Sequence, residues 1–394
     1  MGGVTTLTAD PGLIERVRSS LAAEPGVPTP ARVAAALRSE GAVLGDTAVL
    51  EVTERMRSEL TGAGPLDLLL RRPGITDVLV NGPDDVWVDD GAGLQRASVH
   101  LGEESAVRWL AQRLAASAGR RLDDAVPFVD ARLPSGVRLH AVLPPISPEG
   151  TVISLRVTAT TRFGMDDLVI SGTVPEALAP VLVALVRSKA AFLVTGGTGS
   201  GKTTILGALL GTADPRERVV LVEDSGELRP ALPHVVRLEA RPPNVEGAGR
   251  VGLDDLVRQA LRMRPDRLVV GEVRGAEVVD LLTALNTGHE GGCGTLHANS
   301  AADVPARLEA LGVAAGLRRA AVHAQAIAAL DAVVHLVRDR AGCRRVASVD
   351  LLSRSARDEL VTVPGLEIGP GQVIRRGPGA STLDALVAEV GADR

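Results

Sequence analysis

The stretch VTGGTGSGKTTILG (194–207) overlaps the apolar run AFLVT (191–195) and continues into the helix-forming segment KTTILGALL (202–210). It contains Lys202, one of only two lysines in a chain of 394 residues that otherwise carries its positive charge on arginine. Residues 196–203, GGTGSGKT, match the phosphate-loop pattern, in which a first glycine is followed after four residues by Gly, Lys and Thr. A strand, a glycine-rich turn and a helix in this order predict an α/β fold built around an anion site.

The chemistry of a triphosphate explains the residues of this loop. Glycines let successive backbone N–H groups turn inward as a nest for anions, and the following helix adds the positive end of its dipole. Lys202 supplies a compact point charge that can follow the β and γ phosphates, where a planar guanidinium fits poorly. The Thr203 hydroxyl is a ligand for Mg²⁺, and Thr204 can bond a phosphate oxygen. We therefore expect ATP and Mg²⁺ to be bound by Gly196, Gly197, Thr198, Gly199, Ser200, Gly201, Lys202, Thr203 and Thr204.

Two further strand-like runs, RVVLVED (218–224) and DRLVVGE (266–272), are separated by the helical LDDLVRQALRM (253–263). Strands that alternate with helices indicate a mostly parallel sheet covered by helices on both faces. In such sheets ligands lie at the carboxyl ends of the strands. Acidic residues that follow these runs are therefore candidates for the chemistry of the site.

The first run ends in Glu223 and Asp224, and the second ends in Glu272. Because Asp266 lies at the start of its strand, Glu272 is the carboxylate expected to reach the Mg²⁺ shell. Glu223 is a candidate to orient or deprotonate the attacking water. A helix cap or a surface group is the competing interpretation for either acid alone, and the phosphate loop on the same sheet favours function.

The stretch NTGHEGGCGTLHANS (286–300) contains two histidines. His297 follows the strand-like CGTL (293–296), where an imidazole can contact the γ phosphate and report its loss. His289 precedes the glycine-rich turn. The sequence does not decide between a role in the site and an ordinary structural position for this histidine.

The composition limits the possible partners. A net charge of −5 and an aromatic content of 1% count against nucleic acid as a partner, since both a basic stripe and stacking platforms are absent from the sequence. Cys293 and Cys343 are too few for a disulfide framework, which favours a reducing cytoplasm. The chain starts without a signal-peptide pattern, and its longest apolar run (177–186) is about half the length that spans a bilayer. We expect no direct membrane insertion.

Changes of pattern along the chain predict three regions. Residues 1–60 are a helical amino-terminal region, 61–172 a small α+β domain, and 173–394 the α/β domain with the phosphate loop. The stretch VISGTVPEALAP (169–180) is expected to be the linker between the last two. A Gly/Pro-rich stretch (363–379) is expected to belong to a carboxyl-terminal tail.

Taken together, the motifs resemble the secretion and pilus-assembly ATPase family, the hexameric motors of type II and type IV secretion. The amino-terminal blocks are similar to the branch that serves tight-adherence (Flp-type) pili. Residues 1–55 and those after about 355 carry no signature of this kind. The blocks that carry the resemblance are ELTGAGPLDLLLRRPGITDVLVNGPDDVWVD (59–89), VDARLPSGVRLHAVLPPIS (129–147), ISLR (153–156), GGTGSGKTT (196–204), VEDSGEL (222–228), RMRPDRLVVGEVRGAE (262–277) and TGHEGGCGTLHANS (287–300).

The resemblance implies a RecA-like ATPase domain after the α+β domain, a flexible linker, and a homo-hexameric ring with nucleotide between the domains. It places Glu223 in an aspartate box, Glu272 in the Walker B box and His297 in a histidine box. Arg138 and Arg156 match arginines that reach nucleotide phosphate when the amino-terminal domain closes. Arg132 and Arg274 are weaker candidates, and Phe163 is a candidate to contact adenine beside ordinary core packing.

The function expected from these features is ATP hydrolysis that drives pilus assembly or protein secretion through an inner-membrane platform protein. The chain would then be cytoplasmic and peripheral at the membrane through its partners. A conjugal DNA-transfer ATPase is one alternative, and a nucleotide-dependent scaffold with negligible turnover is another. The cargo, the choice between extension and retraction, and the chain in a ring that supplies each arginine stay open.

Overall fold

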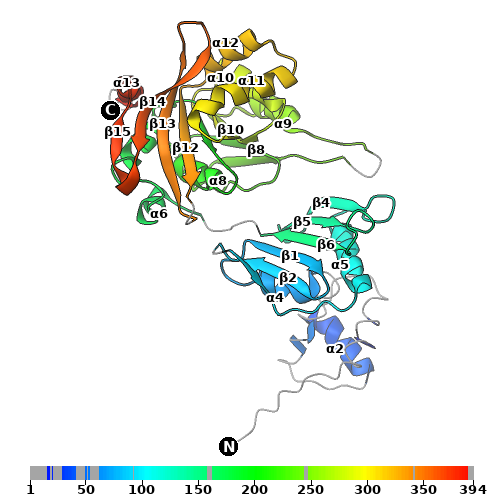
Figure 1. The fold of residues 1–394 in the computed structure, drawn as a ribbon. Coiled ribbons are helices and arrows are strands. Elements are labelled where there is room, and N and C mark those ends of the chain that lie inside the picture. Colours follow the sequence, from blue (N-terminus) through cyan, green and yellow to red (C-terminus); the bar gives the residue numbers. More distant parts are fainter. Residues whose placement is uncertain are drawn as a thin grey trace, which may run out of the picture. The chain divides into compact units, whose positions relative to one another are not determined.

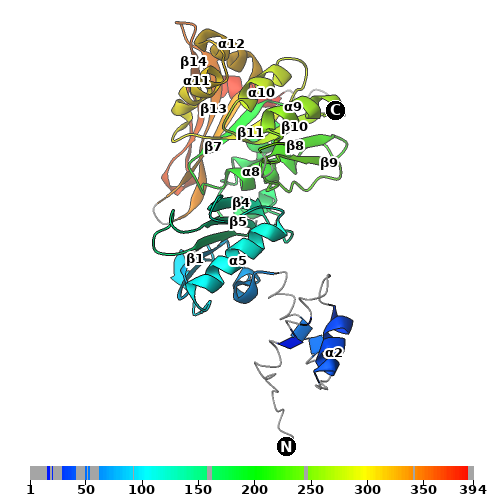
Figure 2. The same cartoon turned by 90° about the vertical axis from the view of Figure 1, so that its right-hand side faces the viewer.

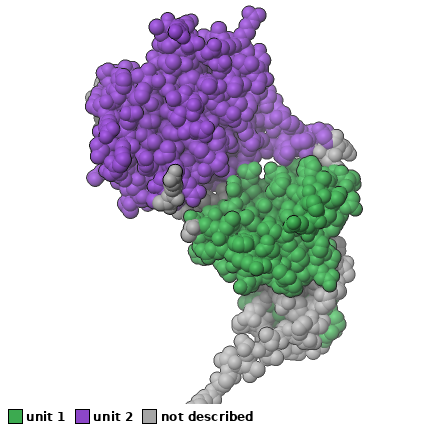
Figure 3. Space-filling model, in the orientation of Figure 1, with its two compact units in different colours: residues 1–159 green, residues 160–394 purple. Residues whose placement is uncertain are grey.

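The computed structural model describes residues 16–17, 20, 29–40, 49–50, 52–53, 62–91, 93–157, 162–243, 247–339 and 342–388. The chain divides into two compact units, Met1–Ala159 and Thr160–Arg394 (Figure 3). This division lies closer to the amino terminus than the expected boundary between 172 and 173. Within the described part of the chain, no helix is both long enough and apolar enough to cross a membrane.

The first element of unit 1 described in full is helix α2 (Pro30–Ser39), which Thr29 caps by accepting a hydrogen bond from the Arg32 N–H. The remainder of the helical region expected within 1–60 lies largely outside the described residues. A 3-10 turn (Gly64–Leu66) and the short helix α4 (Asp67–Leu70) lead into the sheet. The sheet has the strand order β3-β2-β1-β6-β5-β4, and every neighbouring pair is antiparallel. Its strands are β1 (Asp77–Gly82), β2 (Asp85–Asp89), β3 (Leu94–Arg96), β4 (Phe128–Arg132), β5 (Arg138–Val142) and β6 (Val152–Arg156).

Helix α5 (Glu104–Ser117) covers one face of this sheet (Figure 2). Its apolar residues recur at helical spacing and are buried: Val107, Leu110, Ala111, Leu114 and Ala115. They share one core with alternate residues of the strands, such as Leu139 and Ile153. The residues between these alternate positions therefore face the other side of the sheet.

Unit 2 is built on a nine-stranded sheet in the order β15-β14-β13-β12-β7-β11-β10-β8-β9 (Figure 1). The strands from β12 to β9 are parallel, whereas β13, β14 and β15 pair antiparallel. The bounds are β7 (Phe192–Gly196), β8 (Val219–Glu223), β9 (Val235–Glu239), β10 (Arg267–Val273), β11 (Cys293–His297), β12 (Ala332–Arg338), β13 (Arg344–Arg354), β14 (Leu360–Ile368) and β15 (Ile374–Arg376).

Helices cover both faces of this sheet, as expected for parallel strands. One face packs against α6 (Met165–Ile170), α7 (Ala179–Arg187), α8 (Lys202–Leu210) and α13 (Ala380–Ala388). The other packs against α9 (Leu253–Ala260), α10 (Glu277–Leu285), α11 (Val304–Ala314) and α12 (Arg319–Ala329). Short 3-10 turns lie at Leu261–Met263, Ala301–Asp303 and Pro370–Gln372. The expected mixed α/β architecture is thus confirmed.

Two expectations about connecting segments need correction. The stretch 169–180 is no bare linker, because Val174 and Leu178 are fully buried in the core of unit 2 beside Leu182. The Gly/Pro-rich stretch 363–379 is no tail either, since it contributes the end of β14 and the edge strand β15. In both places apolar side chains complete a core that a local pattern of Gly and Pro does not reveal.

Candidate active site

The phosphate loop leaves the buried central strand β7 and ends at helix α8, whose first residue is Lys202. Gly196 has a φ of +151°, and a side chain there would lie 2.5 Å from the Leu336 carbonyl oxygen of the neighbouring strand. Gly201 caps α8 with a left-handed φ of +92°. These backbone conformations explain why glycine is required, and they leave the N–H groups at the start of α8 available to an anion.

Lys202 is 8% exposed and reaches back into its own loop. Its Nζ donates hydrogen bonds to the carbonyl oxygens of Gly196 (3.1 Å) and Gly197 (2.8 Å) and lies 3.4 Å from Nδ1 of His297. Burial lowers the pKa of the ammonium group, and the charge of Glu272 opposes that shift. A phosphate that enters the loop would offer this cation stronger acceptors than two neutral carbonyls.

His297 and Glu272 continue this chain of contacts across the carboxyl edge of the sheet. His297 ends β11, Glu272 lies near the end of the adjacent β10, and the His297 Nε2 is 3.0 Å from the Glu272 Oε1. Burial and the Lys202 charge lower the pKa of His297. Since the ammonium can only donate, the contacts fit a neutral imidazole that accepts at Nδ1 and donates from Nε2. Lys202, His297 and Glu272 are therefore brought together.

Glu223 lies one strand further along the same edge, at the end of β8. Its Oε1 accepts hydrogen bonds from the N–H groups of Glu227 and Leu228, both 2.9 Å away. Its Oε2 is buried and has no hydrogen-bond partner in the described part of the chain. Burial raises the pKa of this carboxyl group to about 7, against the effect of the two N–H groups. An unsatisfied buried carboxylate oxygen is what a site for water or ligand would leave behind.

The loops beside these acids are tied together. Glu223 passes over β10 at Gly271, where a Cβ would lie 2.7 Å from the Glu223 Cγ. Arg274 pairs with Asp224, its Nη2 lying 2.6 Å from Oδ2. The weaker candidate Arg274 thus joins the loop after β10 to the loop after β8, where a structural role accounts for its contact.

Three arginines of unit 1 lie in a single row across adjacent strands. Arg132 is opposite Arg138 in the β4–β5 pair, and Arg138 is opposite Arg156 in the β5–β6 pair. Their neighbours in each strand are buried, so all three face the side of the sheet away from the core. Asp77 continues the row, with Oδ1 3.0 Å from the Arg156 Nε. The Arg138 Nη2 also lies 3.9 Å from the Asp130 Oδ2, so carboxylates on the same face of the sheet balance part of the charge of this row.

The remaining predicted residues are His289, Phe163, Thr203 and Thr204, and only the two threonines lie at the phosphate loop. His289 precedes β11 and is therefore at the amino end of that strand, with Nδ1 3.3 Å from the Ala284 carbonyl oxygen. Phe163 precedes α6 and is 43% exposed. Thr203 and Thr204 lie in the first turn of α8 and are half-buried.

One buried pair behind the loop was not anticipated. The Thr195 Oγ1 is 2.9 Å from the His335 Nδ1, which joins β7 to β12 directly before the phosphate loop. Burial lowers the pKa of His335. A threonine before the first glycine is visible in the sequence, but its partner lies 140 positions further along. This partner can be identified only once β12 is known to pair with β7, which places His335 opposite Thr195.

The chain resembles proteins of secretion and conjugation systems. The sequence profile of the family described as type II/IV secretion system protein matches residues 59–365. A Mycobacterium tuberculosis (strain H37Rv) protein named for conjugal transfer is 56% identical over 328 residues, or 82% of this chain and 93% of the relative. The type IV secretion system protein PtlH of Bordetella pertussis (strain Tohama I) is 35% identical over 255 residues, or 59% of this chain and 75% of PtlH.

A solved structure supports the fold. The crystal structure of the pilus retraction motor PilT with bound ADP has a TM-score of 0.51 and 23% sequence identity, and the match covers 72% of this chain and 81% of PilT. This likeness concerns the fold alone. The RecA-like fold expected from the motifs is confirmed, while the tight-adherence branch stays a prediction.

Proposed function

Since this chain belongs to the type II/IV secretion system protein family, we propose that it is an ATPase that powers a secretion or pilus-assembly machine. The observation that carries the proposal is the continuous chain of contacts from the Lys202 ammonium through His297 to Glu272. It joins a phosphate loop to an acid at the carboxyl edge of one sheet, where nucleotides bind in open α/β folds.

In this proposal the phosphate loop binds the triphosphate through its inward N–H groups and the start of α8. Lys202 exchanges the carbonyl oxygens of Gly196 and Gly197 for phosphate oxygens. Within the described ranges, no three His, Cys, Asp or Glu residues are grouped to hold a metal ion. Mg²⁺ suits this arrangement because it keeps few protein ligands and binds through substrate phosphates. Thr203 and Glu272 would hold it, and it would neutralise charge on the β and γ phosphates.

Hydrolysis is proposed to use the acids of β8 and β10. A water molecule attacks the γ phosphorus, the bond to the β–γ bridging oxygen breaks, and ADP and inorganic phosphate leave. Glu223 accepts the water proton, for which its raised pKa of about 7 suits it at neutral pH. His297 lies beside Lys202 and loses a γ-phosphate contact when phosphate departs.

The arginine row of unit 1 supplies the coupling in this scheme. Arg138 and Arg156 would contact nucleotide phosphate when the amino-terminal domain closes over the ATPase domain, and release it after hydrolysis. Coupled round a homo-hexamer, this cycle would act on an inner-membrane platform protein at the cytoplasmic face of the membrane. The tight-adherence pilus branch and the closing arginines are parts of this proposal that the motif resemblance supports.

Conjugal DNA transfer is the second candidate, because the relative with 56% identity is named for it. DNA transfer and pilus assembly differ in the partner that is expected to stimulate ATP turnover. ATPase activity stimulated by DNA at physiological salt, and not by the platform protein, would favour DNA transfer, while the reverse would favour pilus assembly.

Phosphate release from MgATP by the purified chain tests the ATPase itself, with particle size measured in the same samples. We expect turnover, its loss in Lys202→Ala, and a ring-sized particle when a non-hydrolysable ATP analogue is present. A chain that neither binds nor hydrolyses MgATP would overturn the proposal. Binding with negligible turnover would instead identify a nucleotide-dependent scaffold.

A further inference from the structure

The hairpin formed by β12 and β13 lies along the outer side of the phosphate loop. Strand β12 pairs in parallel with β7, and Leu336 is opposite Gly196 in that pair. Two residues later Arg338 pairs across the hairpin with Arg344. The two arginines are exposed and extend past the end of β7, beside the loop that begins there.

Three glycines of the loop approach this hairpin closely. A Cβ on Gly196 would meet the Leu336 carbonyl oxygen at 2.5 Å, one on Gly199 would lie 3.5 Å from the Arg338 Nη1, and one on Gly201 would lie 3.3 Å from the Arg344 Cδ. In addition, the Arg344 Nε donates a hydrogen bond of 3.0 Å to the Gly199 carbonyl oxygen. The loop therefore rests on the hairpin from its first glycine to its last.

The hydrogen bond to Gly199 has a consequence for the shape of the loop. A nest binds an anion through backbone N–H groups that turn inward, so it depends on how each peptide of the loop is oriented. Arg344 holds the peptide of the Gly199 carbonyl, whose N–H, that of Ser200, donates to the Gly197 carbonyl oxygen at 3.4 Å. A guanidinium is well suited to this because its donors are fixed in one plane.

The two arginines divide their contacts. The Arg338 Nε donates to the Gly342 carbonyl oxygen at 3.3 Å, and Asp339 accepts the Cys343 N–H at its Oδ1. These bonds hold the end of the hairpin. Within the described part of the chain, Arg344 is the arginine of this pair that donates a hydrogen bond to the phosphate loop.

We propose that Arg344 is a positioning residue for nucleotide binding, which holds the phosphate loop in its open, anion-ready shape through the Gly199 carbonyl. The inference rests on the proposed nucleotide site and extends it to a hairpin that none of the sequence motifs includes. Because the shape of the loop serves the phosphates that ATP and ADP share, removal of this bond weakens binding of both nucleotides equally. The chemical step, once the site is saturated, is preserved.

The experiment uses the full chain and four variants. Arg344→Met keeps the aliphatic stem over Gly201 and removes the donors, and Arg344→Lys restores a donor. Arg354→Ala removes an exposed arginine from the other end of β13, where it pairs with Asp358. Lys202→Ala reports on the nucleotide site itself. Dissociation constants for MgADP and for a non-hydrolysable MgATP analogue are measured at low and high salt, together with KM, kcat and the thermal unfolding of the nucleotide-free protein.

We expect Arg344→Met to weaken binding of both nucleotides by about fivefold to tenfold, the scale of one ordinary hydrogen bond, because Arg344 is exposed to water. KM should rise by a similar factor while kcat stays within about twofold. Arg344→Lys should recover most of the affinity, and Arg354→Ala should match the wild type. The loss should persist at high salt, since a positioning bond is screened less than a long-range field.

Wild-type affinity in Arg344→Met would overturn the inference, and so would a loss of affinity that disappears at high salt, which would reduce Arg344 to a diffuse charge. A weaker thermal transition that Arg344→Lys restores without restoring affinity would also contradict it. If the wild type fails to bind nucleotide, the proposed function itself fails. The inference alone fails in another case: the wild type binds nucleotide, Lys202→Ala does not, and Arg344→Met binds it with wild-type affinity.

Discussion

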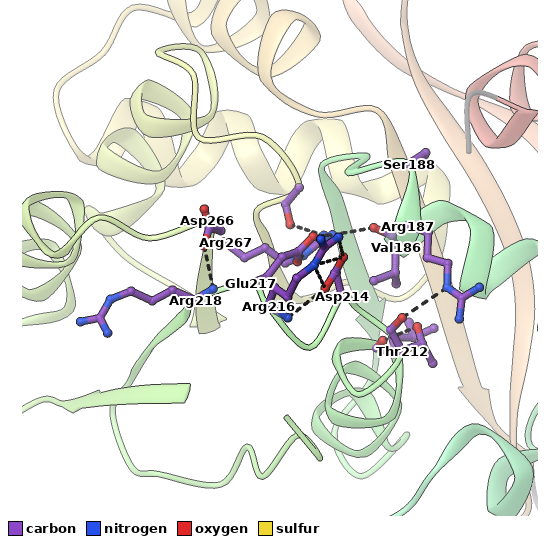
Figure 4. Close-up of polar contacts among 12 residues, drawn as sticks. Val186, Arg187, Ser188, Thr212, Asp214, Arg216, Glu217, Arg218, Asp266 and Arg267 are labelled. Atoms are coloured by element: carbon purple, nitrogen blue, oxygen red, sulfur yellow. Dashed lines mark hydrogen bonds and ion pairs between the residues drawn. The ribbon is translucent and has the colours of Figure 1, made fainter. Parts of the chain in front are cut away.

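Strand β10 has an ionisable side chain near each end, and the two are treated differently by their surroundings. At the amino end Arg267 is fully buried and pairs with Glu217 (Figure 4). Its Nη1 donates to the Gly291 carbonyl oxygen and its Nη2 to that of Val186, at 3.0 and 2.7 Å. At the carboxyl end Glu272 is 38% exposed and contacts His297.

The difference separates structure from chemistry. A buried charge persists only when its hydrogen bonds are satisfied, and Arg267 meets that condition entirely within unit 2. The carboxyl edge is arranged otherwise: Lys202 is held by neutral carbonyls, and Glu223 has a buried oxygen without a partner among the described residues. Groups left in this state are those that a ligand completes, which is why we place the reaction at this end of the sheet.

The largest expected effect concerns the carboxyl end. Replacing Glu272 with Gln should lower ATP turnover about a thousandfold, because a neutral amide is a poorer ligand for the Mg²⁺ that the proposal assigns to this carboxylate. Nucleotide binding and thermal stability should remain, because Glu272 is half-exposed and supports little of the core. Phosphate release and a nucleotide titration check both parts. Retained turnover in Glu272→Gln would remove this acid from the mechanism.

The amino end should respond in the opposite way. Arg267→Met leaves Glu217 and two carbonyl groups without their donor, so unit 2 should lose about 3–5 kcal/mol of unfolding free energy. Urea unfolding followed by circular dichroism measures this loss. Trp87 and Trp109 both belong to unit 1, so tryptophan fluorescence is an internal control that should not change. If folded Arg267→Met were as stable as the wild type, Arg267 would have no structural role.

The arginine row of unit 1 should affect turnover without supporting the fold. Arg138→Ala should lower kcat about a hundredfold, as expected when one group that stabilises transition-state charge is removed. ATP affinity should change by less than about threefold. Arg108→Ala is the control, since Arg108 lies on α5 and pairs with Asp124 at the surface. A fall in ATP affinity with kcat unchanged would instead show that Arg138 contributes to ground-state binding.

The smallest effect is a pH dependence. Burial raises the pKa of Glu223 from 4.5 to about 7. A base must be deprotonated, so turnover should rise about tenfold between pH 6 and pH 8. Folding stability has the opposite sign, because the folded state holds the proton more tightly; this stability is lost as pH rises through about 7. Glu223→Gln should flatten that stability change and lower turnover at every pH. A wild-type profile that is flat across this interval would exclude Glu223 as the base.

Much of this edge could be predicted from the sequence because its signals are local. The phosphate loop is continuous, and Glu223, Glu272 and His297 each follow an apolar run that forms a parallel strand. The rule that carboxyl ends meet at one edge then assembles them. The same rule excluded Asp266 as a ligand for Mg²⁺, because it precedes β10. In the structure its Oδ2 accepts the Arg218 N–H at that amino end of the strand.

Other features depend on pairings between distant segments. Arg344 reaches Gly199 across 145 positions, and nothing in an arginine-rich sequence distinguishes it from a surface residue. Arg267 is hidden in the same way, since its burial depends on Glu217 and on the carbonyls of Val186 in α7 and of Gly291 before β11. Val174 was missed because its neighbours are Gly, Thr and Pro, although its side chain completes the core.

The two lysines allow the most direct test of the central claim, because they lie at opposite ends of β7. Lys189 is exposed before the strand, whereas Lys202 is buried after it. Both are changed to arginine, which keeps the charge, and phosphate release from MgATP is measured. The account predicts that Lys202→Arg loses turnover while Lys189→Arg retains it, because only the nest requires a compact ammonium group. Full turnover in Lys202→Arg, or equal losses in the two variants, would contradict it.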